Sequence, residues 1–331
     1  MSALVKLRLS MLGIMALVIG IATLLVTAIM YALMPETDFA VLIYGSLAFI
    51  VLINVMQWLI GPKIIEAMYR VRPLKPHEYG WLVTSVERVA KASGLKKVPN
   101  VGIAEVSVPN AFAYGNLVFG YKVAVTRGLL EALPPEEVEA VIAHEVGHIR
   151  HRDVEVMMLI SILPALLYWL GRTLIIFGGF GYSDRRRQAS FIPVLAGFGL
   201  FAVSFLMNFF VLYISRLREH YADSNAVLTV DNGGRKLQRA LARILIASGQ
   251  LRNFRPSELN TASKLKAFLI SDPEVGIAAG FRDIDSVVEW IKSRPRLSHM
   301  EIFSTHPDPA KRFRFIDSLE KEIRSRRGFL T

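Results

Sequence analysis

Long apolar stretches alternate with polar segments along this chain of 331 residues. One of the four longest stretches, 156–183, contains Pro164 and Arg172 and is therefore interpreted as a kinked span. The other three have no charged residue and are each longer than the roughly 20 residues with which a helix crosses a bilayer. They lie at 11–34, 39–61 and 191–215. The pattern predicts four transmembrane helices in two hairpins.

The apolar stretches divide the chain into four parts. Residues 1–61 form an N-terminal transmembrane hairpin, and residues 156–215 form a second hydrophobic hairpin. Between and after them lie two polar parts, 62–155 and 216–331. An even number of crossings returns the chain to the side that it left, so both polar parts are expected to build one domain.

Hydrophobic periodicity predicts a mainly α chain with one small β-sheet. The spacing favours a helix over 76–93, and strands over 101–108 and 117–125 that are joined through a turn at Pro109 and Asn110. Further helices are predicted from about residue 134, and over 235–248, 281–292 and 310–326.

The helix that begins near Pro134 carries the main chemical signal. His144 and His148 are four residues apart, so they lie on one helix face, where two neutral imidazoles can bind one divalent ion. Glu145 stands beside them and is placed to take a proton from water activated by that ion. Chance is a poor account of this combination, and we predict a metal-dependent hydrolase site.

A catalytic zinc needs a third protein ligand and an open position. Glu219 is the preferred candidate, since Asp223 lies one turn further and can orient a ligating histidine. His220 is the competing ligand, but it points about 100° away on a helix. His151 is interpreted as a surface or membrane-interface residue, and Asp153 as a residue that either orients a ligand or packs the helix.

The second hydrophobic hairpin separates the predicted ligands along the chain. This hairpin begins eight residues after His148 and ends four residues before Glu219, which corresponds to roughly 12 Å and 6 Å of helix. The metal is therefore expected just beneath the membrane surface.

Composition agrees with a membrane protein. Hydrophobic residues make up 53% of the chain and the mean hydropathy is +0.39. The absence of cysteine excludes a disulfide framework and thiolate ligands. The net charge of +11 indicates contact with anionic lipid at the cytoplasmic leaflet, and no nucleic-acid partner is predicted. Part of the basic excess lies in the last 40 residues, at Arg294, Arg296, Lys311, Arg312, Arg314, Lys321, Arg324, Arg326 and Arg327.

Charges beside the spans predict the orientation. Lys6 and Arg8 precede the first span and Lys63 follows the second, so both ends of the first hairpin are expected in the cytoplasm. Three arginines at 185–187 lie in the loop expected outside and contradict the rule, which leaves the depth of the second hairpin open.

These motifs together resemble the HtpX family of membrane zinc endopeptidases, relatives of the CAAX prenyl proteases. The resemblance rests on the His-Glu-x-x-His pattern at 144–148, the hydrophobic hairpin, and Glu219 followed by Ala222 and Asp223. It extends to Pro-Asn-Ala-Phe-Ala at 109–113, and to Thr-His-Pro at 305–307 followed by Lys-Arg at 311–312.

The resemblance implies a cytoplasmic gluzincin-type α+β protease domain with one zinc ion per chain, on a multi-pass protein of the plasma membrane. It implies that Asn110, Ala111 and Phe112 contact the substrate, and that His306 stabilises the developing oxyanion. Misfolded or membrane-associated proteins are the implied substrates, in membrane quality control and the stress response.

The residues themselves predict hydrolysis by zinc-activated water with Glu145 as general base. An extended peptide is expected to lie along the edge of the predicted sheet. One alternative is a CAAX prenyl protease, and another is a noncatalytic scaffold with a structural zinc. An intramembrane protease is disfavoured, because charged residues flank the motif at 136–139 and 150–155. Transport is weaker still, since the first two spans hold no ionisable residue.

Overall fold

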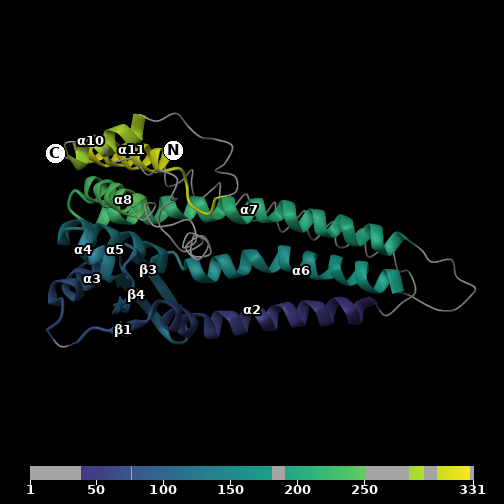
Figure 1. The fold of residues 1–331 in the computed structure, drawn as a ribbon. Helices are drawn as coiled ribbons and strands as arrows, with labels where there is room; N and C mark the ends of the chain where they lie inside the picture. Colours follow the sequence, from purple (N-terminus) through teal and green to yellow (C-terminus); the bar gives the residue numbers. More distant parts are fainter. Residues whose placement is uncertain (1–38, 76, 181–190, 251–282, 294–303, 329–331) are drawn as a thin grey trace, which may run out of the picture. The chain divides into compact units, whose positions relative to one another are not determined.

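The computed structural model describes residues 39–75, 77–180, 191–250, 283–293 and 304–328. The chain divides into two compact units (Figure 1). The first comprises Met1–Leu59 and Glu155–Ile214, and the second comprises Ile60–Val154 and Ser215–Thr331. Three helices contribute residues to both units, namely α2 (Phe39–Tyr69), α6 (Asp153–Phe180) and α7 (Ile192–Thr229).

The first unit holds the apolar helices. Within the described residues, two helical stretches are long and apolar enough to cross a membrane, Asp153–Arg172 and Ile192–Thr229. They overlap the predicted spans 156–183 and 191–215. The second predicted span, 39–61, is helical within α2, whereas the first span and the arginines at 185–187 lie outside the described residues.

Helices α6 and α7 approach each other closely where both carry glycine. A Cβ on Gly171 would lie 2.7 Å from the carbonyl oxygen of Gly197, which leaves no space for a side chain. The Ser204 hydroxyl donates to the carbonyl oxygen of Pro164, at 2.7 Å. Small residues and interhelical hydrogen bonds of this kind hold apolar helices together where there is no hydrophobic driving force between them.

The second unit is built on a mixed sheet covered by helices. The strand order is β1-β2-β4-β3, with β2 parallel to β4 and the other pairs antiparallel. Among the described strands, β3 therefore lies at an edge. The elements are β1 (Val71–Pro73), α3 (Gly80–Ala92), β2 (Asn100–Ala104), β3 (Ala111–Asn116), β4 (Gly120–Thr126), α4 (Arg127–Ala132), α5 (Pro135–Arg150), α8 (Gly233–Gln250), α10 (Ile284–Ser293) and α11 (Pro309–Gly328).

The helix predictions for this unit are confirmed to within a few residues at each end, but the strand prediction was partly wrong. The first strand ends at Ala104, and residues 117–119 form a turn. Residues 111–116 form a strand that the prediction missed, as it did β1. The apolar Leu-Val-Phe run resembles strand, yet Asn116 Oδ1 accepts hydrogen bonds from Val118 N and Phe119 N and closes a turn.

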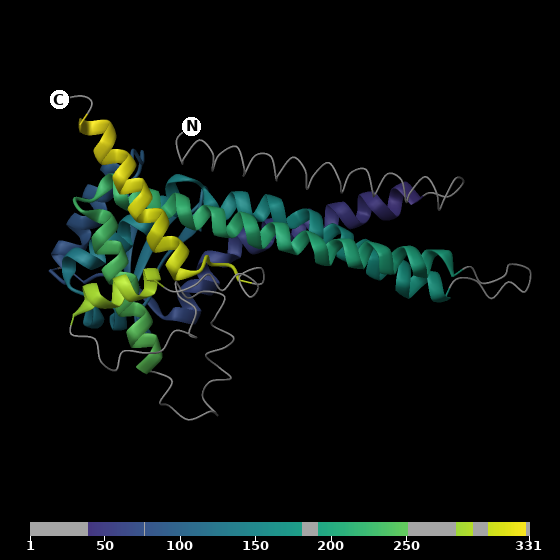
Figure 2. The same ribbon diagram turned by 90° about the horizontal axis from the view of Figure 1, so that it is seen from above.

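One hydrophobic core lies on one face of the sheet and surrounds α5. Side chains of α3, α5, α8 and the strands share this core, and α10 and α11 pack on α8 (Figures 1 and 2). Its largest fully buried members are Leu82, Ile103, Leu129, Ile142, Leu237, Ile244, Phe313 and Ile316. Because α5 is buried along most of its length, polar side chains on it are held in fixed positions.

Candidate metal centre

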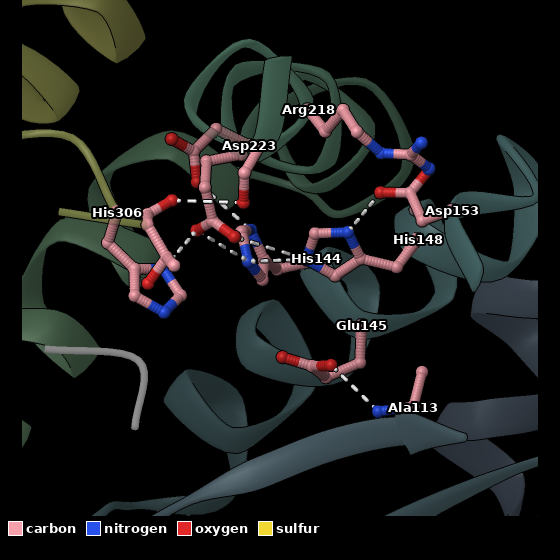
Figure 3. A network of polar contacts seen from close by, with 12 residues as sticks. Ala113, His144, Glu145, His148, Asp153, Arg218, Asp223 and His306 are labelled. Carbon is pink, nitrogen blue, oxygen red and sulfur yellow. Dashed lines mark hydrogen bonds and ion pairs between the residues drawn. The ribbon is translucent and has the colours of Figure 1, made fainter. Parts of the chain in front are cut away.

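Helix α5 carries the two predicted histidines and the glutamate (Figure 3). Pro135 stands at its first position, where a missing N–H costs no hydrogen bond, and acidic side chains follow in the first turn. The Nε2 atoms of His144 and His148 lie 3.2 Å apart. The described histidines and acidic residues include one set able to hold a metal, His144, Glu145 and His148, whose ligand atoms lie within 4.8 Å of one another.

Helix α7 brings Glu219 to the same point. Its two carboxylate oxygens each lie 3.7 Å from one imidazole, Oε2 from His144 Nε2 and Oε1 from His148 Nε2. The close approach of α5 and α7 depends on Gly147, where a Cβ would be 2.9 Å from the Ala222 Cα. Asn225 fixes the pair of helices further, since its amide donates to the carbonyl oxygen of Ala143 at 2.7 Å.

The spacing of these three side chains fits a zinc ion. Zinc binds imidazole nitrogen and carboxylate oxygen at about 2.0–2.2 Å, so two donors in a tetrahedral arrangement lie about 3.4 Å apart. The separations of 3.2 Å between the histidines and 3.7 Å to Glu219 bracket that value. The donor set, two imidazoles and one carboxylate, is also one that zinc accepts in hydrolytic sites.

Each histidine has a carboxylate behind it. Asp223 Oδ1 lies 3.0 Å from His144 Nδ1, and Asp153 Oδ2 lies 2.5 Å from His148 Nδ1. Such a contact fixes the ring and leaves Nε2 to face the metal position. Although burial opposes a charge on His148, the nearby carboxylates of Asp153, Glu219 and Glu145, with Asp153 foremost, together outweigh this effect and raise the pKa of the imidazole to about 9.

Two arginines hold these carboxylates, and neither role was predicted from the sequence. Arg312 donates to both oxygens of Asp223, at 3.0 and 2.6 Å, and its Nη1 lies 3.4 Å from Glu219 Oε2. Arg218 forms an ion pair with Asp153. The signal for Arg312 was its place after the Thr-His-Pro motif. Arg312 was counted in the basic excess that was expected to contact anionic lipid, and for this residue the expectation was wrong, because its side chain is only 3% exposed.

Glu145 is buried next to the sheet. Its Oε2 accepts a hydrogen bond from Ala113 N at 2.9 Å, so this edge N–H points to α5 (Figure 3). Burial raises the pKa of the Glu145 carboxyl, against the opposing effect of His148 and His144. A carboxylate with a raised pKa is better suited to accept and return a proton near neutral pH.

His306, in the segment that precedes α11, also lies at the site. Its Nδ1 is 3.2 Å from Glu219 Oε2. The preceding backbone is held against α7, since Ser215 Oγ donates to the Thr305 carbonyl oxygen and Arg216 Nη1 to that of Ser304. The structure therefore brings His306 to the carboxylate of the third predicted ligand.

The remaining predicted residues make contacts of their own. The His220 ring packs on Phe315, with 4.5 Å between centroids, and His151 Nδ1 donates to the carbonyl oxygen of Gly147 at 2.8 Å. Ala111 begins the edge strand β3 and is followed by Phe112. Asn110 is 1% exposed, and its backbone bonds to Thr126, so a substrate contact of Asn110 stays a prediction.

Comparison with known proteins agrees with this geometry. The sequence profile of the family described as "Peptidase family M48" matches residues 76–320. A "Protease HtpX homolog" of Thermoplasma acidophilum is 39% identical over 324 residues, which is 97% of this chain and 98% of that protein. A "Protease HtpX homolog" of Aeropyrum pernix is 41% identical over 271 residues, or 81% of this chain and 83% of that protein.

A solved structure shares the fold. The crystal structure of S. mikatae Ste24p matches with a TM-score of 0.53 at 18% sequence identity. The match covers 95% of this chain and 66% of the Ste24p chain. At this level of identity the likeness concerns the fold.

Proposed function

The chain belongs to peptidase family M48, and from this premise we propose that it is a membrane-bound zinc endopeptidase whose metal is held by His144, His148 and Glu219. That it is a metallopeptidase of the membrane follows from the family, its HtpX-named relatives and its apolar helices. The observation that supports the ligand set is the closeness of the donors: the two imidazole Nε2 atoms lie 3.2 Å apart, and each lies 3.7 Å from one of the two carboxylate oxygens of Glu219.

The chemistry is divided between the metal and the chain. Zinc, when bound, lowers the pKa of water and polarises a peptide carbonyl. Glu145 accepts the proton of the attacking water and passes it to the leaving amine. His306 stabilises the negative charge that develops on the carbonyl oxygen. Asp223 and Asp153 orient the two histidines from behind.

The substrate strand is β3. A peptide added in extended form beside an edge strand is held by main-chain hydrogen bonds, which are indifferent to its sequence. The strand begins at Ala111 and Phe112, directly after Asn110, and its Ala113 N–H already faces the general base. Broad cleavage of misfolded or membrane-associated proteins is therefore proposed, as part of membrane quality control.

We place the protease on the cytoplasmic side of the plasma membrane. Four spans in two hairpins, with 39–61 crossing as part of α2, return both parts of the soluble domain to that side. We propose for this domain the α+β form of a gluzincin, with one zinc ion bound per chain. The basic residues that remain exposed in α11 are proposed to contact anionic lipid.

A noncatalytic scaffold is the weaker interpretation. A structural zinc usually has four protein ligands. A structural zinc also gives no reason for a buried glutamate with a raised pKa beside the two histidines, whereas a hydrolytic site needs a general base there. The hydrogen bond from Ala113 N to Glu145 Oε2, at 2.9 Å, supports the protease interpretation, because it joins the proposed general base to the proposed substrate strand.

The test is degradation of an unfolded reporter protein by the detergent-solubilised enzyme. Glu145→Gln is expected to lose about 100-fold or more of the activity, since it removes the general base. Glu136→Gln, at an exposed position in the first turn of the same helix, is the matched control and is expected to keep full activity. Equal rates for Glu145→Gln and the unmodified enzyme would refute the proposal.

A further inference from the structure

Three consecutive apolar side chains are exposed at the tip of the β3–β4 hairpin. Leu117, Val118 and Phe119 are 56%, 61% and 56% exposed. Soluble surfaces scatter such residues singly, and a contiguous run marks a surface that contacts a partner or a membrane. We call Leu117, Val118 and Phe119 the apolar tip.

The apolar tip lies beside the part of α2 that follows its uncharged stretch. Lys63 Nζ lies 6.0 Å from the centroid of the Phe119 ring. Further along α2, Glu66 Oε1 accepts hydrogen bonds from Lys122 Nζ at 2.5 Å and from Tyr114 OH at 3.2 Å. These contacts join both strands of the hairpin to α2. Lys63 comes two residues after the end of the uncharged stretch 39–61, which is about 3 Å of helix.

The same end of α2 presents an apolar ridge. Ile60, Ile64 and Met68 are 45%, 50% and 59% exposed, and their spacing of four residues places them on one helix face. Lys63 is exposed as well, and a lysine there can bury its stem and extend its charge to phosphate groups. Apolar side chains with a neighbouring lysine are typical of segments that lie in the membrane interface.

The backbone of the apolar tip is suited to an environment with little water. Asn116 Oδ1 accepts hydrogen bonds from the N–H groups of Val118 and Phe119, at 3.1 and 2.8 Å. In lipid each unsatisfied backbone group costs several kcal/mol, so segments that enter it satisfy these groups internally. The turn thus exposes side chains without exposing these two donors.

We propose that the apolar tip inserts into the interface of the lipid bilayer next to the point where α2 leaves it. The inference rests on the proposed crossing of the membrane by residues 39–61. It adds a second attachment, through the hairpin that carries the substrate strand. Peptide segments that emerge from the bilayer would then meet β3 directly at the membrane surface.

Site-directed spin labelling tests this placement in the full-length protein. The chain has no cysteine, so one introduced cysteine carries the only label. Val118→Cys is labelled after reconstitution into vesicles of phosphatidylglycerol and phosphatidylethanolamine. Collision rates are measured with oxygen, which partitions into lipid, and with a water-soluble nickel chelate. Leu195→Cys, in the apolar part of α7, is the lipid control, and Lys96→Cys, in an exposed loop, is the water control.

The oxygen-to-nickel ratio at Val118 is expected to exceed that at Lys96 severalfold and to approach that at Leu195. A water-like ratio at Val118 beside a lipid-like ratio at Leu195 would overturn the inference and leave a membrane-spanning protease intact. Low collision rates with both reagents at Val118 would also overturn it, because a bound peptide or a second copy of the chain would then cover the apolar tip. A water-like ratio at Leu195 would instead refute the membrane-spanning helices and the inference with them.

Discussion

Arg312 binds both carboxylate oxygens of Asp223, at 3.0 and 2.6 Å, directly behind the histidine that Asp223 contacts. The arginine comes from α11 and the aspartate from α7, 89 residues earlier. The planar guanidinium suits a carboxylate in this two-point arrangement, which lysine cannot reproduce. The metal position is thus held by the C-terminal helix as well as by α5 and α7.

Replacement of this arginine is expected to weaken metal binding. In Arg312→Lys the two-point contact is lost, Asp223 turns more freely, and zinc affinity falls by about 10- to 100-fold. Competition with a fluorescent zinc chelator measures the affinity. Arg324→Met, on the exposed side of α11, is the control and should bind zinc normally. Unchanged affinity in Arg312→Lys would show that Asp223 is held without it.

Complete removal of the charge is expected to destabilise the fold. Arg312→Met leaves the buried carboxylates of Asp223 and Glu219 without their cation, and breaking such a buried pair costs about 3–5 kcal/mol. Thermal unfolding of the metal-free protein in detergent measures the loss, because zinc then makes no contribution. A melting temperature equal to that of Arg324→Met would contradict this expectation.

Separate alanine variants of the two neighbouring ligand candidates, Glu219 and His220, show which of them binds the metal. Glu219→Ala is expected to purify with little zinc, because it removes a carboxylate that lies 3.7 Å from each imidazole. His220→Ala should retain zinc, since the ring of His220 packs on Phe315. Metal content by mass spectrometry decides between them. Retention in the first variant and loss in the second would reverse the ligand assignment.

Zinc binding is expected to release a proton from His148. Against the effect of burial, Asp153, Glu219 and Glu145 together raise the pKa of this imidazole to about 9, so the metal-free protein is expected to hold the extra proton at pH 7.5. A ligating imidazole must be neutral, and zinc affinity should therefore rise with pH up to about 9. Calorimetry in buffers of different ionisation enthalpy counts the released protons. Asp153→Asn should lower the count by up to about one, and an unchanged count would show that Asp153 does not control this ring.

A methyl group at Gly147 is expected to separate two helices. In Gly147→Ala the new Cβ would lie 2.9 Å from the Ala222 Cα, so α5 and α7 must move apart. Overpacking of this kind costs about 1–3 kcal/mol and here also shifts Glu219 from the histidines. Both the melting temperature and zinc affinity should fall. Gly199→Ala, inside α7, has open space around its Cβ and should lower neither.

The part of the site that could be predicted from the sequence is the local part. His144 and His148 are four residues apart, so their common face follows from helix geometry alone, and Glu145 stands directly beside His144 in the chain. Glu219 and Asp223 stand in the same relation on α7, which supports their assignment as a pair. Spacing along one helix therefore suffices to propose both halves of the site.

The part that could not be predicted depends on packing between distant segments. Arg312 contacts Asp223 only because α11 packs on α8 beside the site, and no pattern within α11 encodes that contact. Strand β3 was missed because the more apolar residues 117–119 suggested strand there, while Asn116 and the glycines around them form the turn. Gly115 and Gly120, both with positive φ, were the available signal.

The separation of 89 residues between Asp223 and Arg312 also bears on the order in which the metal centre is completed. Both histidines, Glu145 and Glu219 precede Arg312 in the chain and are therefore synthesised before it. Until α11 has been made and has packed, Asp223 lacks the guanidinium that fixes it. The metal centre is thus expected to gain its full rigidity only once α11 has folded.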